Sequence, residues 1–145
     1  MREIQSAIYI EAQPEEVWRV LTDFPRYAEW NPFIRSVERD ELKPGAQLKV
    51  TMQLPGGEPM VFRPTLLKVV PASELRWVGK LWFKGVFDGE HAFVIEPHRT
   101  GVQFTQREKF SGWLAPLLLV RIRTKTQQAF DEMNRSLKKV VEAKF

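Results

Sequence analysis

A histidine and a glutamate, His91 and Glu108, are the two side chains whose types and predicted placement suit proton transfer. They lie on two strand-like segments, 85–96 and 102–110, and the turn at 97–101 joins these segments into a hairpin. In the register that this turn favours, His91 lies directly opposite Glu108. A slip of one residue would destroy the pairing, so the register is a specific prediction.

In the second segment of this hairpin, 102–110, odd-numbered and even-numbered residues point to opposite faces of the sheet. We expect its odd-numbered residues to point to solvent: Thr105, Arg107 and Lys109. The even-numbered residues then face the core and include two polar side chains: Phe104, Gln106, Glu108 and Phe110. The same register places Ile95 opposite Phe104 and Phe93 opposite Gln106. Because burying a lone carboxylate is costly, Glu108 needs polar partners, and the candidates are His91, Gln106 and Arg63.

Three interpretations of this polar group stay open at the level of sequence. The first is a satisfied buried pair that only holds two strands together. The second is a polar patch that orients a ligand in an apolar pocket. The third is an acid–base dyad of His91 and Glu108, which would add about 10²- to 10⁴-fold to a reaction rate.

A second hairpin, formed by residues 60–70 and 74–80, decides whether Arg63 joins this group. Its turn pairs Leu67 with Trp77, and the resulting parity turns Arg63 toward the core. The proline that follows Arg63 favours an edge position or a bulge, and a bulge would reset the parity before it. The inward orientation of Arg63 therefore depends on an unbroken register.

The elements that position these residues follow from the periodicity of the whole chain. Residues 3–12 alternate as a half-buried strand, and residues 13–16 begin the first of two short helices. From about Ile34 the pattern predicts antiparallel strands, of which 46–54 is the clearest. From Ala115 apolar residues recur at helical spacing over roughly 28 residues. We expect an α+β fold in which a curved antiparallel sheet wraps around this long C-terminal helix.

A cavity is expected where the curl of the sheet leaves a gap beneath the long helix. Its predicted lining combines apolar residues of the sheet and helix with the polar group: Val50, Met52, Arg63, Trp77, His91, Phe93, Gln106, Glu108, Phe110, Phe130, Met133 and Leu137. Apolar burial would supply affinity, and the polar residues would orient a carbonyl or hydroxyl group.

The composition limits the functions that are open to this chain. A length of 145 residues, with 43% hydrophobic and 28% charged, suits one soluble globular domain over 1–145. Cysteine is absent, which excludes disulfides, Cys nucleophiles and thiolate metal sites, and two histidines exclude a metal site with three His ligands. We expect no metal and no cofactor. The net charge of +4 does not demand nucleic acid, and no apolar run could insert stably in a membrane.

Two further groups of residues have several interpretations. Aromatic residues around Gly85 would flank the mouth of the pocket or fill the core: Trp82, Phe83 and Phe87. Cations beside the apolar run 117–120 are usual on a solvated helix face, and a membrane-surface or partner contact is the alternative: Arg121, Arg123 and Lys125.

The stretch Ile10–Phe33, IEAQPEEVWRVLTDFPRYAEWNPF, resembles the opening signature of the START-like, or SRPBCC, superfamily. The segments Gly89–Phe93 and Glu108–Gly112 are similar to its polyketide cyclase/dehydratase-like branch. The resemblance covers essentially the whole chain. It implies the helix-grip fold, in which an antiparallel sheet grips the C-terminal helix over a deep pocket, with two short helices after the first strand.

The resemblance leaves the function open, because the superfamily includes lipid carriers, aromatic polyketide cyclases and co-chaperone domains. The first expectation is binding of a small hydrophobic, lipid-like or polyketide-like ligand between sheet and helix. The alternative is a polyketide cyclase/dehydratase-like enzyme in which His91 and Glu108 move a proton. A homodimer or a protein partner stays open. No charged and apolar leader opens the sequence, so we expect a cytoplasmic location.

Overall fold

The computed structural model describes residues 2–81 and 85–143. Within these residues five strands form one antiparallel sheet in the order β1-β8-β7-β6-β5. Their bounds are β1 Arg2–Ile10, β5 Thr65–Val70, β6 Glu74–Leu81, β7 Phe87–His98 and β8 Gly101–Ser111. A smaller sheet in the order β2-β3-β4 contains β2 Ile34–Glu38, β3 Lys49–Met52 and β4 Met60–Phe62.

Two short α-helices and a 3₁₀ turn follow β1: α1 Pro14–Thr22, η1 Phe24–Arg26 and α2 Tyr27–Trp30. Helix α1 begins at a proline that needs no hydrogen-bond partner there, and the Glu16 carboxylate accepts from the Gln13 backbone N–H. Helix α2 ends at Trp30, and the side-chain oxygen of the next residue, Asn31, accepts from the backbone N–H groups of Phe33 and Ile34. Helix α3 spans Ala115–Glu142, which confirms the predicted start and length of the last helix.

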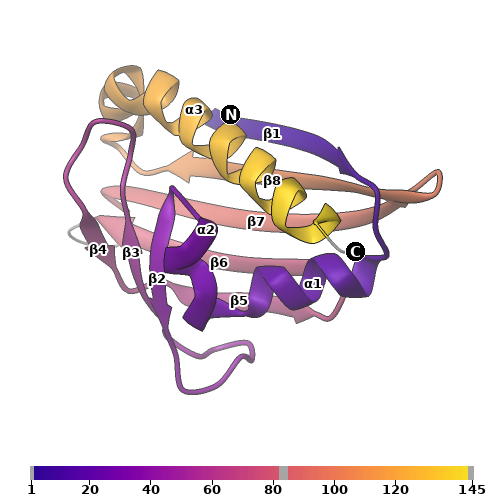
Figure 1. The fold of residues 1–145 in the computed structure, drawn as a ribbon. Helices are drawn as coiled ribbons and strands as arrows, with labels where there is room; N and C mark the ends of the chain where they lie inside the picture. Colours follow the sequence, from indigo (N-terminus) through magenta and orange to yellow (C-terminus); the bar gives the residue numbers. More distant parts are fainter. Residues whose placement is uncertain (1, 82–84, 144–145) are drawn as a thin grey trace.

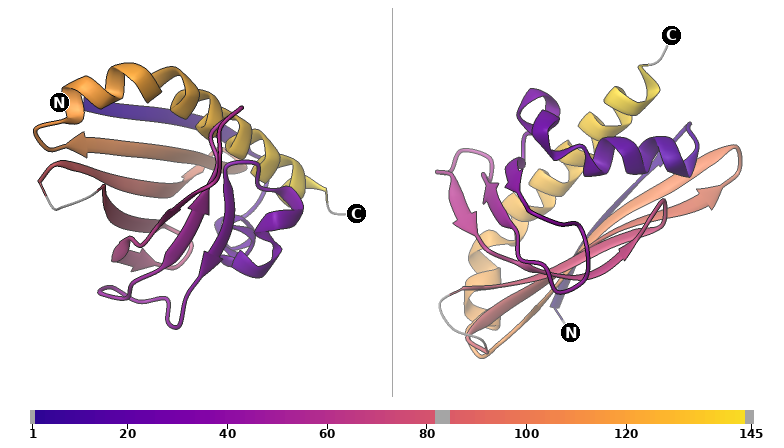
Figure 2. Two further views of the ribbon diagram at one scale, coloured as in Figure 1. Left: turned by 90° about the vertical axis from the view of Figure 1, so that its left-hand side faces the viewer. Right: turned by 90° about the horizontal axis from the view of Figure 1, so that it is seen from below.

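Helix α3 crosses the concave face of the large sheet (Figure 1) and packs chiefly against β1. The short helices and the small sheet lie on the same side of the large sheet as α3 (Figure 2). This arrangement is the predicted one: an antiparallel sheet around a long C-terminal helix, with short helices after the first strand. No helix in the described part of the chain is both long and apolar enough to cross a bilayer.

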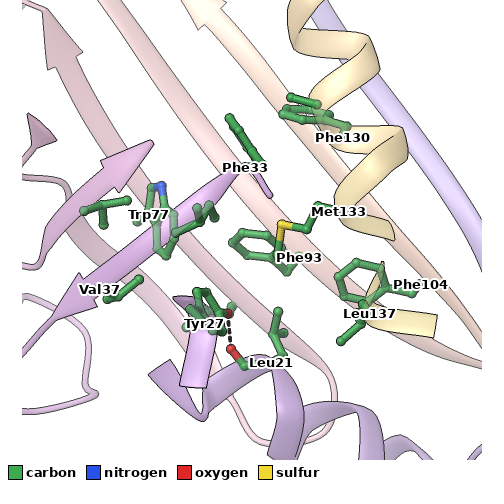
Figure 3. Close-up of a cluster of buried hydrophobic side chains, with 14 of the residues drawn as sticks. Leu21, Tyr27, Phe33, Val37, Trp77, Phe93, Phe104, Phe130, Met133 and Leu137 are labelled. Atoms are coloured by element: carbon green, nitrogen blue, oxygen red, sulfur yellow. Dashed lines mark hydrogen bonds between the residues drawn. The ribbon is translucent and has the colours of Figure 1, made fainter. Parts of the chain in front are cut away.

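The core between sheet and helix is strongly aromatic (Figure 3). Phe93, Phe104 and Phe130 are fully buried, together with Met133 and Leu137 of α3. Tyr27 closes this core from the short helices, and its hydroxyl donates a hydrogen bond to the backbone carbonyl of Leu21. Burial raises the pKa of Tyr27, because the charged phenolate has no water around it.

The predicted strand over 60–70 is wrong in one respect, because it divides into β4 and β5 of two different sheets. Pro64, which has no backbone N–H to donate, lies between them. The register of β5 also shifts, so that Leu66 instead of Leu67 faces Trp77. Arg63 is consequently exposed and does not reach the core, contrary to the prediction.

The prediction that Thr105 faces solvent is also wrong, since only 3% of this residue is exposed. Strand β8 is flanked by β1 and β7, and Thr105 lies between Ala7 and Val94 of these neighbours. A short side chain in a strand with two neighbours is covered even on the outer face of the sheet. Strand 46–54 is shorter than predicted, with the regular ladder limited to β3.

An ion-pair cluster on the outer face of the sheet makes the stability dependent on pH. Arg76 Nε donates to Glu74 Oε2 at 2.7 Å, and Lys68 Nζ lies 3.2 Å from Oε1. Burial alone would raise the pKa of Glu74, but the hydrogen bonds from Arg76 and Lys68 outweigh burial and lower this pKa. The carboxylate therefore stabilises the fold above its unfolded-state pKa, and this contribution disappears as pH falls through the lower folded-state value.

We expect Glu74→Gln to lower the free energy of unfolding by about 1 kcal/mol at neutral pH, with the difference from the parent protein shrinking below about pH 4. Urea unfolding at several pH values measures this difference. Glu41→Gln is the matched control, because its ion pair with Lys43 is fully on the surface. An equal loss in both variants, or a difference that does not change with pH, would contradict the assignment.

Candidate functional site

The predicted register of the β7–β8 hairpin is confirmed. His91 lies opposite Glu108 and Phe93 opposite Gln106, with Ile95 opposite Phe104. Nδ1 of His91 lies 3.3 Å from Oε1 of Glu108, and Nε2 of His91 lies 3.0 Å from Oε1 of Gln106. The hairpin therefore brings together the three polar side chains that the sequence singled out.

His91 is completely buried, whereas 17% of the Glu108 side chain is exposed. Aromatic rings enclose the imidazole: Phe93 stacks on it at 4.4 Å between ring centroids, and Phe33, Trp77 and Phe130 surround it at 6.4, 5.7 and 5.0 Å. A ligand that enters from solvent can therefore touch Glu108 before it reaches His91. His91 therefore lies behind Glu108 as seen from solvent.

A chain of hydrogen bonds continues from His91 across the core to helix α3 and to β1. Gln106 Nε2 donates to Asn134 Oδ1 at 2.7 Å and to the carbonyl of Phe130 at 3.4 Å. Asn134 Nδ2 donates to Ser6 Oγ at 3.0 Å. Ser6 Oγ donates to Asp131 Oδ1 at 2.5 Å, at the half-buried end of the chain.

The direction of this chain determines where His91 carries its proton. A backbone carbonyl and a carboxylate can only accept, so each link from Gln106 to Asp131 donates in the same direction. Gln106 Oε1 is thereby left as an acceptor, and Nε2 of His91 must donate to it. Nδ1 of His91, 3.3 Å from Oε1 of Glu108, makes no hydrogen bond among the described residues.

A cavity of about 210 Å³ lies next to this pair. It is bounded by the first half of α3, the small sheet and the ends of β6, β7 and β8. Its lining is mostly apolar: Phe33, Met52, Leu54, Met60, Phe62, Pro64, Trp77, Gly79, Lys80, Phe87, Gly89, Glu108, Phe110, Leu118, Ile122 and Thr126. Glu108 brings a carboxylate to this wall, and the exposed Lys80 brings a cation.

Four of the predicted lining residues border this cavity, and the other eight do not. Met52, Trp77, Glu108 and Phe110 border it. The remaining predicted residues other than Arg63 are buried in the core instead: Val50, His91, Phe93, Gln106, Phe130, Met133 and Leu137. The cavity is displaced along α3 toward its N-terminal half, where Leu118, Ile122 and Thr126 face it.

Two glycines, which the sequence reasoning missed, create much of this space. Gly79 of β6 lies opposite Gly89 of β7, so neighbouring strands lack side chains on the wall that faces α3. A Cβ at Gly89 would collide with the Glu108 carboxylate, which occupies the place of the missing side chain. Glycine inside a strand often marks a place where another group approaches the backbone closely. The two glycines within the predicted strands were therefore the sequence signal that could have located the cavity.

Of the aromatic group around Gly85, Phe87 borders the cavity and stacks on Phe110, with ring centroids 5.5 Å apart. Trp82 and Phe83 lie outside the described residues. A second hollow, formed by Pro32 and the C-terminal half of α3, is a wide-open depression of about 310 Å³. Its charged residues are exposed or half-buried, and none of its residues belongs to the chain of hydrogen bonds that starts at His91.

The geometry defines a class: a curved antiparallel sheet closed by a C-terminal helix, with an apolar cavity and one carboxylate in its wall. The sequence matches the family described as "Polyketide cyclase / dehydrase and lipid transport" over residues 1–142. The chain belongs to this family. A search of curated proteins finds no match.

Solved structures share this fold at low sequence identity. The di-domain ARO/CYC BexL from the BE-7585A biosynthetic pathway aligns with 99% of this chain and 51% of its own, at 14% identity and a TM-score of 0.79. TTHA0849 from Thermus thermophilus aligns over 98% of both chains, at 17% identity and a TM-score of 0.75. Ara h 8.0201 aligns over 99% of both, at 14% identity and a TM-score of 0.67. This chain thus spans about half the length of the di-domain protein.

Proposed function

We propose that this protein binds a small, largely apolar molecule that carries one hydroxyl or N–H group and directs this group at Glu108. The observation that carries the proposal is the apolar cavity with a carboxylate in its wall. The family description, which names polyketide cyclases and lipid transport, supports a hydrophobic ligand of this kind.

The size of the cavity favours a compact ligand. An engineered cavity of about 150 Å³ in another protein holds benzene, and the space here is about 210 Å³. One to two fused rings fit this volume. Most drug-sized ligand sites are about 300–1,000 Å³, so a long acyl chain or an extended poly-ketone would need the cavity to widen.

The Glu108 carboxylate favours a hydrogen-bond donor over an anion at its own place in the wall. His91 contacts Oε1 of Glu108, and Oε2 lies in the space that Gly89 leaves free. Oε2 can therefore accept a hydrogen bond from a ligand. A ligand carboxylate at the same place would meet like charge, which is costly in an apolar surrounding.

Two aromatic probes that differ by one hydroxyl group test this proposal. We expect calorimetry to show that 2-naphthol binds about tenfold more tightly than naphthalene, because its hydroxyl donates to a carboxylate. Glu108→Gln should remove most of this preference and leave naphthalene binding unchanged. The matched control is Glu96→Gln, an exposed glutamate of the same hairpin, which should bind as the parent protein does.

Failure of both probes to bind would overturn the binding proposal. Equal affinity for the two probes would overturn the role of Glu108 and leave the apolar cavity as the binding element. Native mass spectrometry of freshly purified protein then identifies any molecule of matching size that is carried through purification.

A second candidate function is acid–base catalysis, favoured by the 3.3 Å contact between His91 and Glu108. In an aldol-type closure, Glu108 would remove a proton from a carbon between two carbonyls. The resulting enolate would attack a further carbonyl carbon of the same molecule, and the new alkoxide would take the proton back. The linear triketone 2,4,8-nonanetrione is the test substrate, because attack of the carbon between its first two carbonyls on the third closes a six-membered ring. Faster cyclisation with the parent protein than with Glu108→Gln supports catalysis, and equal rates exclude it for this substrate.

A further inference from the structure

The first turns of α3 expose a second apolar face that the cavity does not use. Leu118 and Ile122 point to the cavity, whereas Leu117 is 65% exposed and Val120 is 82% exposed. Trp113, just before the helix, is 72% exposed. Three large apolar side chains so close together on one segment are unusual on a surface that contacts only water.

The charged side chains of the segment that carries this face all have one sign. Residues 109–130 contain four cations and no acidic residue: Lys109, Arg121, Arg123 and Lys125. The last three are exposed, and within the described residues they form no ion pair. Near the other end of the same helix, by contrast, Lys138 pairs with Glu142 at 2.7 Å. The unpaired cations therefore belong to the same part of the helix as the exposed apolar residues.

We propose that this face, defined by Trp113, Leu117, Val120, Arg121 and Arg123, docks on an anionic lipid surface. A helix that lies in the membrane interface buries its apolar side chains among the acyl chains and keeps flanking arginines at the headgroups. Tryptophan is enriched at the same depth. Each cation near an anionic bilayer strengthens binding about fivefold, so charge and apolar burial act together.

This face lies beside the cavity, so docking would bring the cavity close to the lipid surface. Lys125 lies close to the β3–β4 turn, since a side chain at Gly56 would come within 3.7 Å of its Nζ. Met60, which borders the cavity, is 43% exposed on the next strand. If the cavity binds an apolar ligand as proposed above, the docked protein could pass this ligand between the cavity and the lipid without exposing it to water. This step rests on the proposed function. The docking itself does not depend on that function.

Sedimentation with lipid vesicles tests the docking directly. We expect the protein to sediment with vesicles of phosphatidylcholine and phosphatidylglycerol, to stay in solution with phosphatidylcholine alone, and to be released as salt rises. Arg121→Gln/Arg123→Gln should weaken binding by about 30-fold. Leu117→Ser/Val120→Ser should weaken it by at least about tenfold.

The control variant Arg135→Gln/Lys139→Gln removes the same charge from the depression near the other end of α3, and it should bind vesicles as the parent protein does. Equal weakening by both charge variants would show attraction by net charge only and overturn the docking face. Absence of binding to anionic vesicles would overturn it as well. Circular dichroism checks folding, and naphthol binding by the same variants separates failure of docking from failure of the cavity.

Discussion

Replacing Gly79 by isoleucine should make the protein more stable and at the same time weaken ligand binding by about 100-fold. A Cβ at this position meets only Pro64, at an ordinary contact distance of 3.8 Å. Gly79 has the same parity as Trp77 and borders the cavity, so the new side chain enters the space that a ligand would occupy.

The gain in stability has two sources. Glycine in a strand is destabilising by roughly 0.5–1 kcal/mol, and isoleucine removes this penalty. Burying its branched side chain among Phe62 and Trp77 adds about 1–2 kcal/mol. Thermal unfolding and calorimetry with 2-naphthol measure the two effects on one sample.

Gly79→Ala is the matched control, because a single methyl group occupies little of the cavity. It should give a small gain in stability and keep most of the binding. If Gly79→Ile instead lowers the unfolding temperature, the wall at this point is already packed, and the cavity is not the binding site.

Residue pairs whose register is fixed by a nearby hairpin turn were predictable from the sequence. The β7–β8 turn determines that His91 faces Glu108, because register propagates from a hairpin turn in steps of two residues. The same reasoning failed in β5, where a bulge near Leu67 moves Leu66 opposite Trp77. A bulge adds one residue without changing the apolar pattern enough to be seen, and the error placed Arg63 inside.

The location of the cavity was not predictable in the same way. Strand parity shows correctly that Phe93 faces the interior, and helical spacing does the same for Phe130. Neither pattern shows how far α3 stands from the sheet above each residue. That distance depends on the missing side chains at Gly79 and Gly89, and residues of the small sheet complete the wall of the cavity. A cavity forms where side chains are small or missing, whereas the periodicity of a sequence shows where large apolar side chains lie.

The buried polar chain leads to the largest expected effect on stability. Gln106→Leu keeps the approximate volume but removes every hydrogen bond of the side chain. It leaves His91 Nε2 and Asn134 Oδ1 without partners in a core that is closed to water. Each unsatisfied group costs about 1–3 kcal/mol, so the free energy of unfolding should fall by roughly 2–5 kcal/mol. Urea unfolding of the parent protein and the variant measures the loss.

A double-mutant cycle distinguishes a hydrogen-bonded chain from simple packing. Asn134→Leu alone leaves Gln106 Nε2 and Ser6 Oγ with fewer partners, whereas Gln106→Leu/Asn134→Leu removes both sides of their shared bond. We expect the double variant to lose less stability than the two single losses combined, because fewer buried groups are left unsatisfied. Strictly additive losses would mean that the 2.7 Å contact between Gln106 and Asn134 does not couple them, and the argument that this chain sets the proton on His91 would fail with it.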